Sequence, residues 1–238
     1  MFSLSSALQD FGKDPDWVLK TTIGGFINYA ALALFVINPA LTPISFFLMG
    51  LSTGYILRSA RSAMRGELDK LPAWNEILDL IISGLSWLSI SAGFYFFSLS
   101  CLIISLIAAA AVDIHQVQNP NSLIWAQSTF QFLYWLIAGQ NFFLAVLVLN
   151  FAEEERMAAG FAWRKTLRRI FKAPLLLGTT WLAGSALTAL ALIVPTASVI
   201  GAVLTPFCFF LAQIITSRLM GQAWAYLNEL EKLPPAKA

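Results

Sequence analysis

Charged side chains are scarce in this chain. Only 12% of its 238 residues are Asp, Glu, Lys or Arg, whereas 58% are hydrophobic. A soluble domain carries about 25% charged residues, and only about half of its residues are apolar. With so little charge, the polar surface is too small to cover a soluble particle, so we expect lipid to surround much of the protein. The composition therefore predicts an integral membrane protein.

Residues that usually carry enzyme chemistry are also rare. The single histidine, His115, lies two residues after Asp113, and the two cysteines, Cys101 and Cys208, fall in separate apolar runs. No nucleotide-binding glycine loop, serine-hydrolase elbow, zinc-protease motif or calcium loop is present. We interpret Asp113 and His115 as a solvated loop pair and the cysteines as small hydrophobic residues. The sequence therefore predicts a protein that is not an enzyme, with no catalytic residue, cofactor or metal site and no nucleic-acid partner.

Six hydrophobic segments are long enough to cross a membrane as helices. A helix rises 1.5 Å per residue and needs roughly 20 residues to cross a hydrocarbon layer of ~30 Å. Asn38-Pro39 and Pro43 interrupt the first long run, because proline removes a backbone donor. The sequence leaves open whether residues 21–57 cross twice or form a re-entrant hairpin. We predict one all-α transmembrane domain over residues 1–238, a bundle of about six helices with interfacial amphipathic helices; the spans are about 21–37, 42–57, 80–111, 122–149, 174–194 and 198–217.

The basic residues alternate with the predicted spans. All 15 Lys and Arg residues precede the first span, follow the last one, or lie in the second-to-third and fourth-to-fifth connections. Lys and Arg near the ends of spans are retained in the cytoplasm. The distribution therefore predicts cytoplasmic N- and C-termini in a protein of the cytoplasmic membrane, or of the thylakoid membrane if the source is photosynthetic.

Small and polar residues recur at helical spacing inside the spans. Gly50 and Gly54 lie one turn apart in the second span, which lets another helix approach closely. We identify a candidate polar seam within the membrane and interpret it mainly as a set of hydrogen bonds between helices. The alternative is that the same residues line a polar cavity. The seam consists of Asn28, Gln127, Gln131, Tyr134 and Asn141.

The second span is followed by a candidate surface for a partner or for lipid. Arg58, Arg61 and Arg65 are spaced by three and four residues, so we expect the helix to continue with a basic stripe toward headgroups or a partner. Leu71-Pro72 would turn the chain, and Trp74 would anchor it at the membrane surface.

Residues 163–172 form a second candidate surface of the same kind, because they alternate with the period of an amphipathic helix. At 100° per residue, Trp163 shares an apolar arc with Leu167, Ile170 and Phe171. We predict a helix lying on an anionic leaflet; the alternative is a basic loop that only sets topology, and either could dock a partner's acidic loop. The preceding acidic triplet 153–155 is interpreted as charge at a helix N-terminus. The opposite, basic arc contains Arg164, Lys165, Arg168, Arg169 and Lys172.

A set of residues within 20–100 forms a recognisable pattern: Gly54, Tyr55, Arg58, Arg65, Gly66, Leu71, Pro72 and Trp74, followed by Asp79, Leu80, Gly84 and Leu85. This pattern resembles the signature of a domain-of-unknown-function family of prokaryotic multi-pass membrane proteins. The resemblance implies a helical membrane protein and supplies no activity. Members of the family occur in archaea and bacteria, photosynthetic ones included, so the resemblance is compatible with a thylakoid location.

Two functions fit these features. The preferred one is a non-catalytic accessory, assembly or scaffold subunit of a larger membrane complex, with membrane lipids and other membrane-protein subunits as partners. The alternative is a transporter or permease-like component for a neutral or lipidic substrate, with a hydrated cavity at Gln131 and Asn141. Ion-coupled transport is disfavoured, because the spans hold no ionisable group near the membrane midplane.

Overall fold

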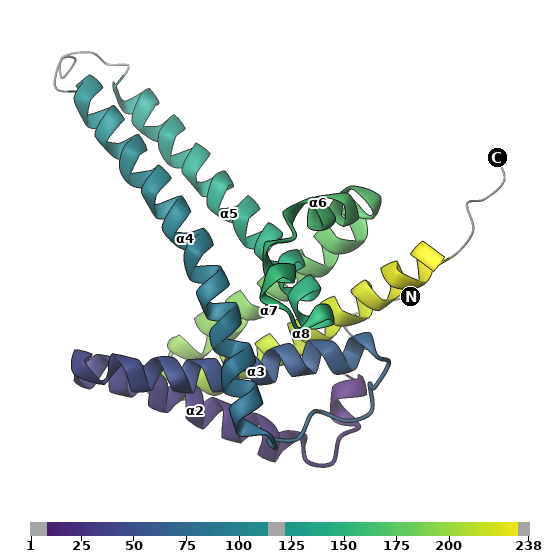
Figure 1. The fold of residues 1–238 in the computed structure, drawn as a ribbon. Helices are drawn as coiled ribbons and strands as arrows, with labels where there is room; N and C mark the ends of the chain where they lie inside the picture. The colour runs from purple at the N-terminus through teal and green to yellow at the C-terminus, as the bar shows by residue number, and fades with distance from the viewer. Residues whose placement is uncertain (1–8, 114–121, 233–238) are drawn as a thin grey trace.

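The computed structural model describes residues 9–113 and 122–232, and this part of the chain contains helices and no β-strand (Figure 1). The all-α prediction is therefore confirmed. The loop that contains His115, and with it the interpretation of His115 and Asp113 as a pair, lies outside the described residues. In chain order the helices are α2 (Trp17–Ile37), η1 (Pro39–Leu41), α3 (Thr42–Met64), α4 (Ile77–Asp113), α5 (Ser122–Glu154), η2 (Met157–Phe161), α6 (Trp163–Lys172), α7 (Pro174–Thr196) and α8 (Val199–Lys232).

Six of these helices are long and apolar enough to cross a membrane, namely α2, α3 together with η1, α4, α5, α7 and α8. Their number and order match the predicted spans. We call the end of the bundle that carries most of the Lys and Arg residues the basic end. At this end α3 continues to Met64, as the arginine spacing predicts, whereas α8 continues to Lys232, beyond the predicted end of its span. The described helices therefore form a six-helix transmembrane bundle.

The break between α2 and α3 follows from the Asn38-Pro39 sequence. Asn38 is extended, with φ −151° and ψ 111°, and its side-chain oxygen accepts a hydrogen bond from the backbone N–H of Ala40. Pro39 then begins the short η1 turn, and α3 starts at Thr42. Residues 17–64 consequently fold into two antiparallel helices of 21 and 23 residues, each long enough to span a hydrocarbon layer by itself.

The bundle has two unequal parts. The helices α2, α3, α7 and α8 lie beside one another, whereas the α4–α5 hairpin crosses α3 and leans away from them (Figure 1). The described part of α4 has the lowest buried fraction of the six candidate spans. The hydrophobic core lies near the basic end, where Tyr55, Leu71 and Phe210 form one cluster and Trp224 belongs to a second.

Close backbone contact fixes the crossing of α3 and α4. Gly54 lies directly against the backbone of Leu80, and Gly84 lies against the backbone of Gly50, so that a side chain at Gly54 or Gly84 would collide with main chain. The small-residue pair predicted in the second span thus faces α4. Interhelical van der Waals contact of this kind is a principal source of helix association in lipid.

The acidic triplet lies at the opposite end of a helix from the one predicted. Glu153 and Glu154 are the last residues of α5, and Glu155 leaves the helix with φ +56°. The interpretation as N-terminal capping charge is therefore wrong. The triplet instead faces arginine and lysine side chains of α3 and α6, as described below.

Candidate functional site: the basic end of the bundle

The segment that connects α3 to α4, residues 65–76, is held in place by a buried carboxylate. Asp14 accepts hydrogen bonds from the backbone N–H of Leu71 at 2.6 Å and from the Lys20 ammonium at 2.7 Å. Lys20 also donates to the carbonyl oxygen of Leu71 at 3.0 Å. Burial by itself raises the pKa of Asp14, but the hydrogen bonds from Lys20, Leu71 and Asp16 outweigh it, so the pKa is lower than the ordinary value. We call Asp14, Lys20 and the Leu71 backbone the Asp14 clamp.

Aromatic packing holds the middle of the same segment. The Tyr55 hydroxyl donates to the carbonyl oxygen of Pro72 at 2.9 Å, and the Tyr55 and Trp74 rings stack with centroids 4.0 Å apart. The indole N–H of Trp74 donates to the carbonyl oxygen of Lys20 at 2.9 Å. Trp74 is therefore half-buried against α2 and α3, and Leu71 is fully buried. Of the three residues predicted to face a partner or the membrane surface, Leu71 is therefore corrected to a buried residue, whereas Pro72 and Trp74 are half-buried.

Arg218 of α8 secures the beginning of the connection. Its side chain is 1% exposed and donates to the carbonyl oxygens of Glu67, Leu68 and Lys70. Sequence reasoning placed Arg218 among the basic residues beyond the last span. The apolar residues of α8 continue beyond Arg218 to the buried Trp224. This continuation of the apolar pattern could have indicated from the sequence that Arg218 lies within a packed helix.

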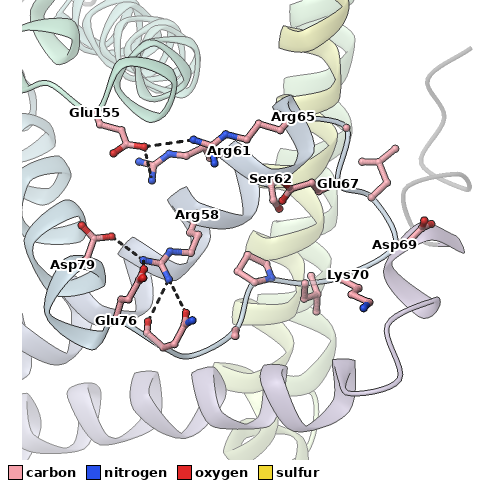
Figure 2. Close-up of a pocket in the computed structure, with 16 residues that line it drawn as sticks. Arg58, Arg61, Ser62, Arg65, Glu67, Asp69, Lys70, Glu76, Asp79 and Glu155 are labelled. Carbon is pink, nitrogen blue, oxygen red and sulfur yellow. Dashed lines mark hydrogen bonds and ion pairs between the residues drawn. The ribbon is translucent and has the colours of Figure 1, made fainter.

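The arginine stripe on α3 has the predicted spacing, but two of its three members bind other helices of the same chain (Figure 2). Arg58 donates to the Asn75 side chain, Glu76 and Asp79 at 2.8–3.0 Å, which ties α3 to the start of α4. Arg61 donates to the carbonyl oxygen of Ala152 at 2.9 Å and pairs with Glu155 at 2.9 Å, which ties α3 to the end of α5.

Only Arg65 remains largely exposed, with its guanidinium 3.9 Å from Glu155. The expectation that the whole stripe faces headgroups or a partner is therefore corrected for Arg58 and Arg61. Two main-chain features support the internal pairs: Glu76 and Glu155 both have positive φ, +53° and +56°. Such backbone conformations are costly for non-glycine residues and persist when neighbouring interactions fix them.

An open groove of about 970 Å³ lies between the arginine stripe and the 65–76 connection. Both basic and acidic side chains line the groove (Figure 2). The arginines of the stripe lie opposite Glu76, Asp79 and Glu155, and Glu67, Asp69 and Lys70 lie along the connection. Most of these charges are already paired inside the protein. Within residues 9–113 and 122–232, no cluster of three or more His, Cys, Asp or Glu side chains is placed to hold a metal ion.

Helix α6 is attached to the bundle by polar contacts on one face. Asn150 donates to the Thr166 hydroxyl at 2.7 Å, and both residues are fully buried. Arg169 lies over the Trp224 ring at 4.1 Å and donates to Glu153 at 3.2 Å. The predicted exposure of Arg169 is therefore wrong.

Glu153 joins three helices at this point. Besides Arg169 of α6, it accepts hydrogen bonds from the Trp224 indole at 3.2 Å and from the Asn228 amide at 2.8 Å, both on α8. Lys165 pairs with Glu154 at 2.6 Å. The acidic end of α5 thus fixes the position and rotation of α6. The remaining predicted residues of α6, namely Trp163, Arg164, Arg168 and Lys172, are exposed.

The predicted polar seam is dispersed along the helices. Asn141 of α5 accepts a hydrogen bond from the Tyr95 hydroxyl of α4 at 2.7 Å, so it joins the two helices of the hairpin. Gln131 and Tyr134 are exposed on the hairpin, and Asn28 is half-buried on α2. The side chain of Gln127 lies outside the described residues. Of the four members whose side chains are described, Asn28 thus lies on α2 and the other three lie on α5.

The described part of the chain is thus a helical protein with six membrane-length helices and a basic end whose connections are held by internal ion pairs and hydrogen bonds. A family model described as "Protein of unknown function (DUF4013)" matches residues 34–206, and the chain belongs to this family. No curated protein and no solved structure matches the chain. The family assignment agrees with the predicted domain of unknown function and supplies no activity.

Proposed function

We propose that this protein is a non-catalytic accessory or scaffold subunit that binds another membrane protein through its α4–α5 hairpin. The observation that carries the proposal is that the half of the hairpin farther from α3 packs against no other described helix of the chain. Phe96, Phe97 and Trp135 are each about two-thirds exposed or more, and the hairpin leans away from the other four helices (Figure 1).

The length of the hairpin supports the same proposal. Its helices contain 37 and 33 residues, which corresponds to roughly 55 and 50 Å. A hydrocarbon layer is about 30 Å thick, and membrane helices are usually tilted by about 20°. The hairpin therefore either crosses at a steep tilt or extends beyond the bilayer, and both arrangements provide a long surface for partner helices.

Polar groups on this surface suit an interface within or beside the membrane. Gln131 and Tyr134 are exposed on α5 among large apolar side chains. Polar side chains on membrane helices stabilise association by hydrogen bonding across the interface, by about 0.6–2 kcal/mol each. A partner helix packed on this face would satisfy them, while the remaining apolar residues supply van der Waals contact.

The basic end supports a scaffold more than an enzyme. Asp14, Arg58, Arg61 and Arg218 each make several hydrogen bonds or ion pairs within the chain, so their polar groups are used in fixing connections. The transporter alternative expected a hydrated cavity at Gln131 and Asn141. Asn141 is instead bonded to Tyr95 and Gln131 is exposed, so this arrangement favours the scaffold.

The proposal includes a location. Contacts such as Lys13 with Asp69, Arg61 with Glu155 and Arg218 with Lys70 bring basic segments from separate parts of the chain to one end of the bundle. Because Lys and Arg are retained on the cytoplasmic side, we propose that this end and both termini are cytoplasmic, in an inner membrane or a thylakoid membrane.

The proposed function is tested by photo-crosslinking in native membranes. A photoreactive phenylalanine derivative is placed at Phe97 of α4 or Trp135 of α5, and a matched control is placed at Phe35, an exposed residue of α2. We expect both hairpin positions to yield a discrete protein adduct of the same mass, and Phe35 not to yield it. Phe97→Ala should weaken the adduct formed from Trp135. Lipid adducts alone at both hairpin positions, together with a monodisperse monomer in mild detergent, would overturn the proposal.

A further inference from the structure

The exposed half of α6 has a fixed orientation. Its opposite face is fastened by Thr166 to Asn150 and by Arg169 to Glu153 and Trp224. A helix of ten residues held at two points one turn apart cannot rotate without breaking these contacts. We call the outward half, consisting of Trp163, Arg164, Arg168, Phe171 and Lys172, the exposed α6 face.

Apolar and basic residues divide the exposed α6 face lengthwise. At 100° per residue, Trp163 and Phe171 lie within about 80° of each other, and the arginines and Lys172 follow on the next arc. Trp163 is 52% exposed and Phe171 is 78% exposed. Large aromatic residues beside cations are typical of helices that lie in the plane of the membrane interface.

The face lies beside the entry of a membrane span. Helix α6 ends at Lys172, Ala173 is not helical, and α7 begins at Pro174. Leu175, the second residue of α7, is 81% exposed. Because α7 is one of the six membrane-length helices, α6 directly precedes the start of a candidate membrane span.

Two cations on this face are available to a ligand. Within the described part of the chain, no acidic side chain lies within ion-pair distance of Arg164 or Arg168, and the Arg164 guanidinium lies 5.2 Å from the centre of the Trp163 ring. Lys165, by contrast, is paired with Glu154. A guanidinium binds phosphate oxygens with two parallel hydrogen bonds, so Arg164 and Arg168 are matched to a phosphate group.

We propose that the exposed α6 face binds the phosphate of an anionic glycerophospholipid. Arg164 and Arg168 bind the phosphate, and Trp163 and Phe171 enter the boundary between headgroups and acyl chains. A partner's acidic loop would satisfy the arginines but leave the two aromatic side chains in water, so the lipid is the better match. This inference does not depend on the hairpin's partner.

Native mass spectrometry tests the proposal on the full-length protein. The protein is released from nanodiscs that contain equal amounts of phosphatidylglycerol and phosphatidylcholine with identical acyl chains. We expect the retained lipid to be enriched in phosphatidylglycerol. Arg164→Gln and Arg168→Gln should each reduce this enrichment roughly five-fold, because a basic side chain near an anionic surface contributes about this factor. Arg65→Gln removes another exposed arginine of the basic end, whose charge is partly offset by Glu155 at 3.9 Å, so it should change the ratio much less.

The apolar edge has its own readout. Phe171→Ser should lower the total lipid retained while leaving the ratio of the two lipids unchanged, because the phosphate contacts remain. Circular dichroism confirms that each variant is folded. Equal retention of both lipids by the wild type overturns the proposal, as does a loss for Arg65→Gln as large as for Arg168→Gln. Retention of an acidic protein on this face without a preference for phosphatidylglycerol would replace the lipid with a protein partner.

Discussion

Removing the Asp14 carboxylate should destabilise the protein by releasing the connection between α3 and α4. Asp14 is 1% exposed and accepts three hydrogen bonds, two from backbone N–H groups and one from Lys20. In Asp14→Ala, the Leu71 N–H and the Lys20 ammonium lose this acceptor. Breaking a buried ion pair costs about 3–5 kcal/mol. Because the Asp14 clamp lies at the end of the bundle, we expect the lower end of that range, about 3 kcal/mol.

The assay is an SDS titration in mixed micelles, followed by tryptophan fluorescence, which gives the free energy of unfolding. Asp14→Asn keeps one acceptor oxygen and loses the charge, so it should show about half the loss of Asp14→Ala. Asp69→Ala is the matched control, since this carboxylate is exposed and should have no measurable effect. Hydrogen exchange provides a local readout: residues 66–76 should exchange faster in Asp14→Ala, and α6 should not.

The same carboxylate predicts a dependence on pH. The pKa of Asp14 in the folded protein lies below its ordinary value of 3.8, so the unfolded chain takes up the proton first as the pH falls. The contribution of the clamp is therefore fully present well above pH 3.8 and is lost as the pH falls through the lower, folded-state pKa. Asp14→Asn should lose less stability than the wild type over this interval. Unchanged stability of Asp14→Ala at neutral pH would refute the reasoning.

Two further predictions concern the packing and the topology. Gly54→Ala should destabilise the protein by about 1–3 kcal/mol, because the new methyl group meets the backbone of Leu80. Gly93→Ala on α4, where nothing lies within 4 Å, should cause no such loss of stability. Equal losses for the two variants would contradict the α3–α4 contact. Single cysteines introduced at Arg65 and at Arg168 should both be labelled by a membrane-impermeant maleimide only in inverted vesicles, in a background without Cys101 and Cys208. Labelling of the two positions from opposite sides would disprove the proposed sidedness.

Much of the architecture could be predicted because it depends on local properties of the chain. A helix in lipid satisfies its own backbone hydrogen bonds, so a long apolar run already specifies a spanning helix. The Asn38-Pro39 break between α2 and α3 is local for the same reason. The length of α8 was less predictable, since α8 continues to Lys232, beyond the predicted span, and buries Trp224 against other helices.

The candidate surfaces show where such reasoning ends. Trp74 is a residue type that often anchors helices at the membrane interface, yet it stacks on Tyr55 and donates a hydrogen bond to the Lys20 carbonyl oxygen inside the protein. Arg58 and Arg61 have the spacing of an exposed stripe, yet their partners lie on α4 and α5. A periodic pattern says which residues share a face, but it does not say what covers that face.

The all-α class, the number and order of the six membrane-length helices, and membership of a domain-of-unknown-function family could therefore be predicted from the sequence alone. Tertiary structure decided which basic residues are internal and which can meet a ligand. Arg168 and Arg169 are adjacent and chemically identical, yet the first is exposed and the second is buried between Glu153 and Trp224. The reason is physical: the rotation of α6 is set by side chains that lie 16 and 55 residues away along the chain, and no local pattern contains that information.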